Sequence, residues 1–186
     1  MATHGGEPTR WSNALFSGMP TYQMSPSYSA TQTLSNASKA YGLWTSSWFP
    51  PINYLFLYLL GFYILLRAFN FKPYLAALGS ILWAFSSYFL IIIAAGHIWK
   101  VLTLAFIPPT IGGLILCYRG KLLWGGAVTA IFTAFQIMSN HFQMSYYFLF
   151  PMLFLALAYG VDALLHRRLL GWLKATLMLA FAGLLG

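Results

Sequence analysis

Acidic side chains are nearly absent from this chain. Its 186 residues include two Asp and Glu against ten Lys and Arg, and charged residues make up 6% of the total. Soluble domains carry about 25% charged residues, so this chain lacks the surface charge that water would solvate. Because 60% of its residues are hydrophobic, the composition predicts an all-α, polytopic membrane protein.

The net charge of +8 does not indicate a nucleic-acid partner. The basic residues are dispersed in short clusters between apolar runs, which is the pattern that orients a membrane protein in the bilayer. The single cysteine, Cys117, excludes an internal disulfide and lies in an apolar run, as a small buried hydrophobic residue would.

Apolar runs of spanning length begin at Pro50. A transmembrane helix needs about 20 apolar residues. Six runs fit this length, at about 52–69, 74–95, 101–118, 122–138, 144–161 and 169–186. Within the third run, Pro108 and Pro109 are expected to kink or break the helix.

Small residues recur at a spacing of four in two of the runs. The rows are Ala76, Ser80 and Ala84, and Gly126, Ala130 and Ala134. This spacing places each row on one helix face, where small side chains let neighbouring helices approach closely.

The basic residues also predict the orientation of the chain. One set of alternating helix ends carries seven of them: Arg67, Lys72, Arg119, Lys121, Arg167, Arg168 and Lys174. The other set carries three: Arg10, Lys39 and Lys100. The positive-inside rule puts the first set in the cytoplasm. Residues 1–49 and the loops around 96–100 and 139–143 are then extracytoplasmic.

Residues 1–49 differ from the rest of the chain. They are polar and rich in Ser, Thr and aromatic residues, which predicts an ordered extracytoplasmic loop ahead of a transmembrane domain at 50–186. Export of such a loop needs a span before it. We therefore expect the chain to be cut at its start, and also at its end, inside the last span.

Two residues of the outer loops, His97 and Lys100, are candidates for binding a phosphate. They are three positions apart, so they lie near one face of a continuous helix. Lys supplies a compact cation, and His donates or accepts a proton. The alternative is structural: Lys100 snorkels to the headgroups while His97 caps a helix end.

A second candidate group comprises Asn140, His141, Gln143 and Tyr147. Polar groups of this kind are costly in a bilayer unless they are used. Binding of a polyhydroxylated or phosphorylated group explains them, and so does a hydrogen-bonded helix turn. Zinc bound by His97 and His141 would lack further ligands, so no metal site is predicted.

Carboxylates that could act as a general base are limited to Glu7 and Asp162. Asp162 is expected at a cytoplasmic helix end, paired with His166 or Arg167. Glu7 is thus the one outer candidate in the chain, and otherwise the base lies upstream of Met1.

Three segments resemble the bacterial YfhO family of multispan membrane proteins. They are residues 11–23, the pair Gly96-His97 with Lys100, and residues 140–147. The resemblance implies a GT-C-like glycosyltransferase that transfers a sugar from a polyprenyl-phosphate carrier to a cell-envelope acceptor outside the cytoplasm. In that class an acidic motif in the first outer loop serves as base or binds a divalent metal. Residues 1–49 resemble the later part of that loop, so this piece alone is expected to be inactive.

The resemblance also implies roles for individual residues. His97 and Lys100 would face the carrier phosphate, and Asn140, His141 and Gln143 would contact the donor or the acceptor. Trp11 and Tyr22 would stack on sugar. Two other classes remain open at this point. One is a transporter or flippase for an anionic or lipid-linked substrate, and the other is a membrane scaffold whose outer loops bind a partner.

Overall fold

The computed structural model describes residues 3–4, 7–8, 11–12, 19–20, 39, 42, 50–139 and 141–186. The chain forms two compact units, residues 1–38 and residues 39–186. In the first unit, β1 (Thr3–His4) pairs with β2 (Glu7–Pro8), and β3 (Trp11–Ser12) pairs with β4 (Met19–Pro20). Both pairs are antiparallel ladders of two residues per strand.

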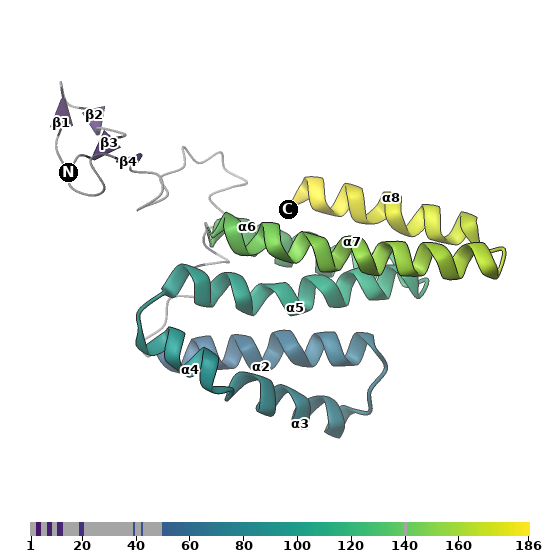
Figure 1. Cartoon of the computed structure of the whole chain (residues 1–186), viewed down its shortest axis with the longest axis horizontal. Helices are drawn as coiled ribbons and strands as arrows, with labels where there is room; N and C mark the ends of the chain where they lie inside the picture. Colours follow the sequence, from purple (N-terminus) through teal and green to yellow (C-terminus); the bar gives the residue numbers. More distant parts are fainter. Residues whose placement is uncertain are drawn as a thin grey trace. The chain divides into compact units, whose positions relative to one another are not determined.

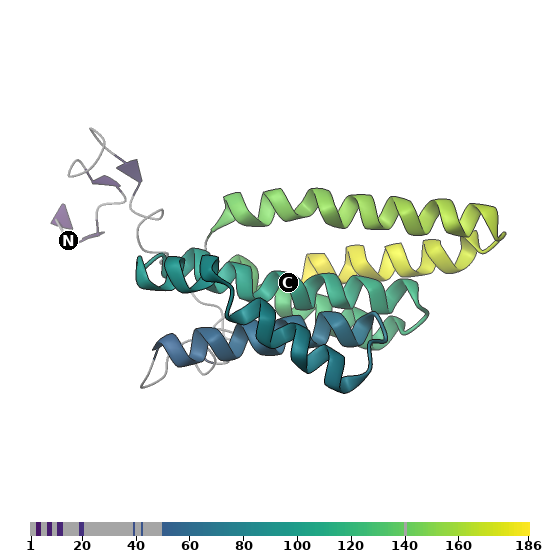
Figure 2. The same ribbon diagram turned by 60° about the horizontal axis from the view of Figure 1, so that its bottom comes forward.

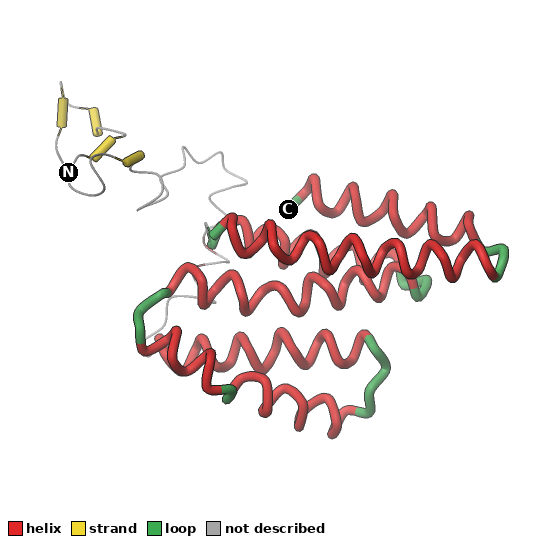
Figure 3. Tube along the Cα trace, viewed as in Figure 1, coloured by secondary structure: helices red, strands yellow, loops and turns green. Residues whose placement is uncertain are grey.

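The described part of the second unit is helical. Its helices are α2 (Pro50–Ala68), α3 (Pro73–Ala84), α4 (Ser87–Ala94), α5 (Ile98–Tyr118), α6 (Leu122–Met138), α7 (Phe142–Leu165) and α8 (Leu169–Leu185). Short turns join them (Figures 1 and 3). The turn between α3 and α4 interrupts a single pass, and the other turns lie alternately at the two ends of the bundle. The sequence-based prediction of an all-α transmembrane domain is confirmed in its helical content.

Three helices are long and apolar enough to cross a membrane: α2, α5 and α7. A fourth span results if α3 and α4, which meet at an angle of 46°, count as one broken helix. The predicted runs at 122–138 and 169–186 do form helices, α6 and α8, of 17 residues each. At 1.5 Å per residue each is about 26 Å long, short of a hydrocarbon core of about 30 Å. Six spans therefore stay a prediction.

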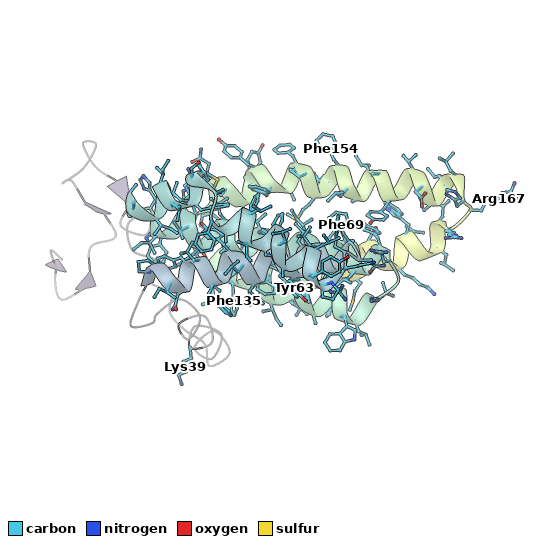
Figure 4. All side chains as sticks on the ribbon, turned by 90° about the horizontal axis from the view of Figure 1, so that it is seen from below. Lys39, Tyr63, Phe69, Phe135, Phe154 and Arg167 are labelled. Atoms are coloured by element: carbon cyan, nitrogen blue, oxygen red, sulfur yellow. The ribbon has the colours of Figure 1, made fainter. Side chains whose placement is uncertain are left out.

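Helix α5 is the centre of the bundle. It packs against α2, α4, α6, α7 and α8, and most of its residues are buried. Tyr58 of α2 is fully buried and donates a hydrogen bond of 2.9 Å to the carbonyl oxygen of Val101. By contrast, α7 buries only Ala163, and Figure 2 shows it running along one side of the other helices. In Figure 4, Phe154 points outward from α7.

Pro108 and Pro109 were expected to kink or break their helix, and the break is wrong, because α5 runs without interruption from Ile98 to Tyr118. A kink stays a prediction. Each proline removes the hydrogen bond to the carbonyl four residues earlier. Both prolines are buried in protein, where neighbouring helices compensate for such a loss.

The break lies one helix earlier, between α3 and α4. Helix α3 ends at Ala84, and Ser86 has extended backbone angles (φ −64°, ψ 144°) before α4 begins at Ser87. Ser86 is the N-cap of α4, a position that serine favours because it competes with helical hydrogen bonding. The Ser86 side chain makes no capping hydrogen bond. The bend therefore lies at a serine pair inside an apolar run, and not at the two prolines.

Glycines allow neighbouring helices to approach α5 closely. A Cβ atom on Gly61 of α2 would lie 2.6 Å from the carbonyl oxygen of Ala105 and 3.1 Å from Cδ of Pro109. Ala105 is the residue whose carbonyl loses its helical partner to Pro109. Gly113 of α5 itself faces α6. A Cβ atom on Gly113 would lie 2.8 Å from the carbonyl oxygen of Gly125 in α6.

The predicted packing roles of the two small-residue rows agree with these contacts. Ala76, Ser80 and Ala84 are the buried residues of α3, and α3 packs on α2. Gly126 is buried in α6, where an added Cβ would lie 2.6 Å from Cε of Met178 in α8.

We predict that Gly61→Ala destabilises the bundle. The new methyl group collides with backbone atoms of α5, and overpacking of this kind costs about 1–3 kcal/mol. Gly183→Ala is the matched control, because a Cβ there meets nothing within 4 Å and alanine favours the helix. Thermal unfolding in detergent should give a lower Tm for Gly61→Ala alone. Equal Tm values for the two variants would contradict the close approach of α2 and α5.

Candidate functional site

Two of the predicted outer residues, His97 and His141, lie at one end of the helical bundle. His97 lies in the turn before α5 and His141 directly before α7. Both turns lie at the same end, which we call the histidine end (Figure 1). The turns at 69–72, 119–121 and 166–168 lie at the opposite end, which we call the basic end.

At the histidine end, Lys100 contacts an aromatic ring. Its Nζ atom lies 5.5 Å from the centroid of the Tyr88 ring in α4. This distance is within the range of about 6 Å for a cation–π interaction. Lys100 is half-buried, whereas His97, one turn earlier, is exposed. The backbone of His97 starts α5, because its carbonyl accepts a hydrogen bond of 2.9 Å from the Val101 amide.

The polar residues of α7 divide between two faces of that helix. His141 is half-buried, and its Nδ1 atom is buried without a hydrogen-bond partner among the described residues. Gln143 and Tyr147 are exposed, and the Gln143 amide donates a hydrogen bond of 2.8 Å to the Tyr147 hydroxyl. His141 directly precedes α7, and its carbonyl oxygen accepts a hydrogen bond of 3.0 Å from the Met144 amide.

A groove of about 400 Å³ lies between α2, the α3–α4 pair, α5 and α7. Tyr88, the partner of Lys100, lines this groove. Its other lining residues are almost entirely apolar. They include Pro108 of α5, and the exception is Ser86, at the break between α3 and α4. Across the groove, α7 contributes Met144 and Phe148. Lys100 does not line the groove, but it contacts Tyr88, which does.

Stacked aromatic rings form part of the groove wall. Trp83 stacks on Phe62 with ring centroids 4.6 Å apart and lies 4.9 Å from the Phe89 centroid. The Nε1 atom of Trp83 is buried without a hydrogen-bond partner among the described residues. A buried indole N–H usually has an acceptor, so a bound molecule with an oxygen atom would satisfy this donor.

A second cavity of about 300 Å³ lies on another face of α7, between α5, α6, α7 and α8. It has several polar side chains: Thr110, Thr129, Thr133, Gln136 and Ser145. Gln136 is 4% exposed. The hydroxyls of Thr129 and Ser145 are buried and lack hydrogen-bond partners among the described residues. Unpaired polar groups of this kind need water or a polar ligand.

The structure brings only part of the predicted site together. Within residues 50–139 and 141–186, no hydrogen bond joins His97 or Lys100 to His141 or Gln143. Asn140 and Tyr22 lie outside the described residues. Two further candidates belong to the first unit, with only their backbone described: Trp11 in β3 and Glu7 in β2.

Sequence reasoning missed Tyr88, Ser86 and Trp83. Each lies in a run that reads as one continuous apolar span, so nothing local distinguishes them from lipid-facing or core residues. The serine pair at 86–87 is the one available indication, because serine favours helix starts. The partnership between Tyr88 and Lys100 depends on the turn at 95–97 and is not visible in the sequence.

Comparison with known proteins does not assign a family. No protein family, curated protein or solved structure matches the chain. Among the described residues, no three His, Cys, Asp or Glu side chains cluster as metal ligands would.

The orientation can be tested by cysteine labelling in intact bacteria. Cys117 is buried, so the wild-type chain should not react and serves as the control. His97→Cys is expected to react with a membrane-impermeant maleimide, because the positive-inside rule places that turn outside. Arg167→Cys, at the far basic end in Figure 4, should react only after permeabilisation. The reverse pattern would overturn the predicted orientation.

Proposed function

We propose that this chain binds a polyprenyl-phosphate-linked sugar at the histidine end. It forms part of a GT-C-like glycosyltransferase of a bacterial inner membrane, which transfers the sugar to an extracytoplasmic cell-envelope acceptor. The observation that supports this most directly is the groove between α2, α3–α4, α5 and α7, whose wall residue Tyr88 holds the cation Lys100.

The groove suits the two unlike parts of such a carrier. The apolar and aromatic walls suit an isoprenoid chain, since lipid sites are concave and mainly apolar. The Lys100 ammonium suits a phosphate, as a compact cation with three donors. Lys100 can leave the Tyr88 ring to bind a phosphate, because a cation–π contact is worth only about 0.5–1 kcal/mol at an exposed site.

Sugar transfer also needs groups near the carbon that reacts. The acceptor hydroxyl must lose a proton to a base, and the bond from the sugar to the phosphate must break as the phosphate takes up negative charge. Lys100 would stabilise that charge, and His141, with its unpaired Nδ1, would hydrogen-bond the donor or the acceptor. Asp162, the acidic residue of the helical unit, lies near the end of α7 at the basic end, so it is not a candidate base for a reaction at the histidine end.

Two observations favour a second function, transport or flipping of an anionic or lipid-linked substrate. The bend of 46° between α3 and α4 is of the kind that transporters use at substrate sites. The cavity beside Thr129 and Ser145 places unpaired hydroxyls between helices, where polar groups mark substrate paths. The two functions differ in product: the first makes a glycosidic bond, and the second only moves its substrate.

We predict that Lys100→Gln weakens binding of polyprenyl phosphate by about ten- to a hundredfold. This range corresponds to the loss of one charge-assisted hydrogen bond, about 1.5–3 kcal/mol. Lys72→Gln, which removes the same charge at the basic end, should bind as the wild type does. Binding is measured as the rise in Tm with added short-chain polyprenyl phosphate in nanodiscs. Equal affinities for both variants would remove Lys100 from the site.

For the chemical step, we predict that His141→Ala in the complete protein leaves its amount in the membrane unchanged but abolishes glycosylation of the envelope polymer. His166→Ala, at the basic end, should retain glycosylation. The measurement follows transfer of radiolabelled sugar from the polyprenyl carrier in membranes. Normal transfer by His141→Ala contradicts its role, and carrier movement in vesicles with no new glycosidic bond in the wild type would favour flipping.

A further inference from the structure

A separate cavity of about 250 Å³ lies at the basic end, away from the groove. Four parts of the chain enclose it: the end of α5, the turn into α6, the last turns of α7 and the first turns of α8. Its polar wall contains Arg168, Lys174, Asp162 and the aromatic residues Tyr118, Tyr159 and Trp172. None of these residues has a role in the proposed sugar transfer.

The charges of this cavity favour an anion. Arg168 and Lys174 both line it, and Asp162 is the one acidic residue of the chain outside the first unit. The Asp162 carboxylate is already engaged, since its Oδ1 atom lies 3.1 Å from Nδ1 of His166. Both side chains of that pair are well exposed, at 64% and 60%, so water weakens the field of the carboxylate. The cavity wall therefore has one more cation than anion.

Two helix N-termini add to the positive potential. Helix α6 begins at Leu122 and α8 at Leu169, and both starts border the cavity through Leu122 and Arg168. Neither helix has an acidic residue in its first turn or a side-chain cap, so the partial positive charge of each N-terminus is not neutralised. Carbonyl oxygens at the end of α5 also lie near the cavity, and their partial negative charge would disfavour an anion. Two of them already accept hydrogen bonds: the Cys117 oxygen from the Gly120 amide, and the Leu116 oxygen from the Lys121 amide.

The aromatic residues form a fixed wall whose polar groups are already bonded. Tyr118 stacks on Tyr159 with centroids 4.9 Å apart and an interplanar angle of 15°. The Tyr118 hydroxyl lies 3.1 Å from Oγ1 of Thr176, and Trp172 Nε1 donates to the Ala156 oxygen at 3.0 Å. A ligand would therefore find its polar partners in Arg168, Lys174 and the helix N-termini.

We propose that this cavity binds the phosphate group of an anionic phospholipid from the cytoplasmic leaflet. Basic cavities between transmembrane helices on the cytoplasmic side bind anionic headgroups, and the positive-inside rule assigns the basic end to that side. Arg168 and Lys174 hold the phosphate, and the aromatic wall packs against the glycerol backbone. The chemistry recognised is a phosphate ester, and its source is the bilayer.

The test uses the full chain in nanodiscs of phosphatidylcholine with increasing fractions of phosphatidylglycerol. In the wild type, the Tm rises with the phosphatidylglycerol fraction. In Arg168→Gln and Lys174→Gln, the fraction needed for half of this rise increases about fivefold for each cation removed, as expected for about 1 kcal/mol per basic residue. Arg167→Gln is the matched control, because it removes the same charge from the neighbouring position, which does not line the cavity; it should match the wild type.

Asp162→Asn tests the same cavity by a change in the opposite direction, which a loss of folding would not produce. It removes an exposed carboxylate and its contact with His166, and it should lower the fraction of phosphatidylglycerol needed for half of the Tm rise. Responses of Lys174→Gln and Asp162→Asn that equal the wild-type response overturn the proposal. A last arm adds glycerol 3-phosphate to discs of phosphatidylcholine alone. No Tm rise there supports the lipid as source, and a rise that Lys174→Gln abolishes overturns the lipid and assigns the cavity to a soluble phosphate ester.

Discussion

The bundle depends on close backbone approach to α5. Apolar side chains gain little by leaving lipid for other apolar side chains, so helices in a bilayer associate through tight packing. Here glycines provide it on more than one side of α5, with Gly61 of α2 facing Ala105 and Gly113 facing Gly125 of α6. The same contact with α2 covers the place where Pro109 interrupts helical hydrogen bonding. One constraint thus explains both the central position of α5 and its tolerance of two prolines.

That packing also positions the proposed site. In the groove, α7 and the α3–α4 pair form two facing walls. Leu104 and Pro108 of α5 line the wall between them. Lys100 reaches Tyr88 because the turn at 95–97 folds α4 back beside the start of α5. The cation is therefore held by two helices that a short turn connects, whereas His141 is delivered by a third helix from later in the chain.

The helices were predictable from the sequence, and their interruptions were not. The apolar runs, bounded by Lys, Arg, Gly and Asn, predicted the ends of five helices within a few residues, because the bilayer sets the length of a span. These helices are α2, α5, α6, α7 and α8. The continuity at Pro108 goes against single-residue propensity, since burial among neighbouring helices decides whether a weak point bends. The break at Ser86 agrees with the preference of serine for helix starts, but the apolar run around it hides that signal. Alternation of helices placed His97 and His141 at one end. The pairing of Lys100 with Tyr88 and the two faces of α7 required the tertiary packing.

The order of the helices has a consequence for biogenesis. Helices enter the membrane in the order of synthesis, and N-terminal parts can fold before later parts are made. The two partners that pack most extensively on α5, α2 and α6, are both complete when synthesis reaches residue 138. Helix α7, which buries only Ala163, then joins a bundle that already exists. The wall of the groove that carries Met144 and Phe148 is thus the last to be added, so closure of the groove is separated in time from assembly of the core.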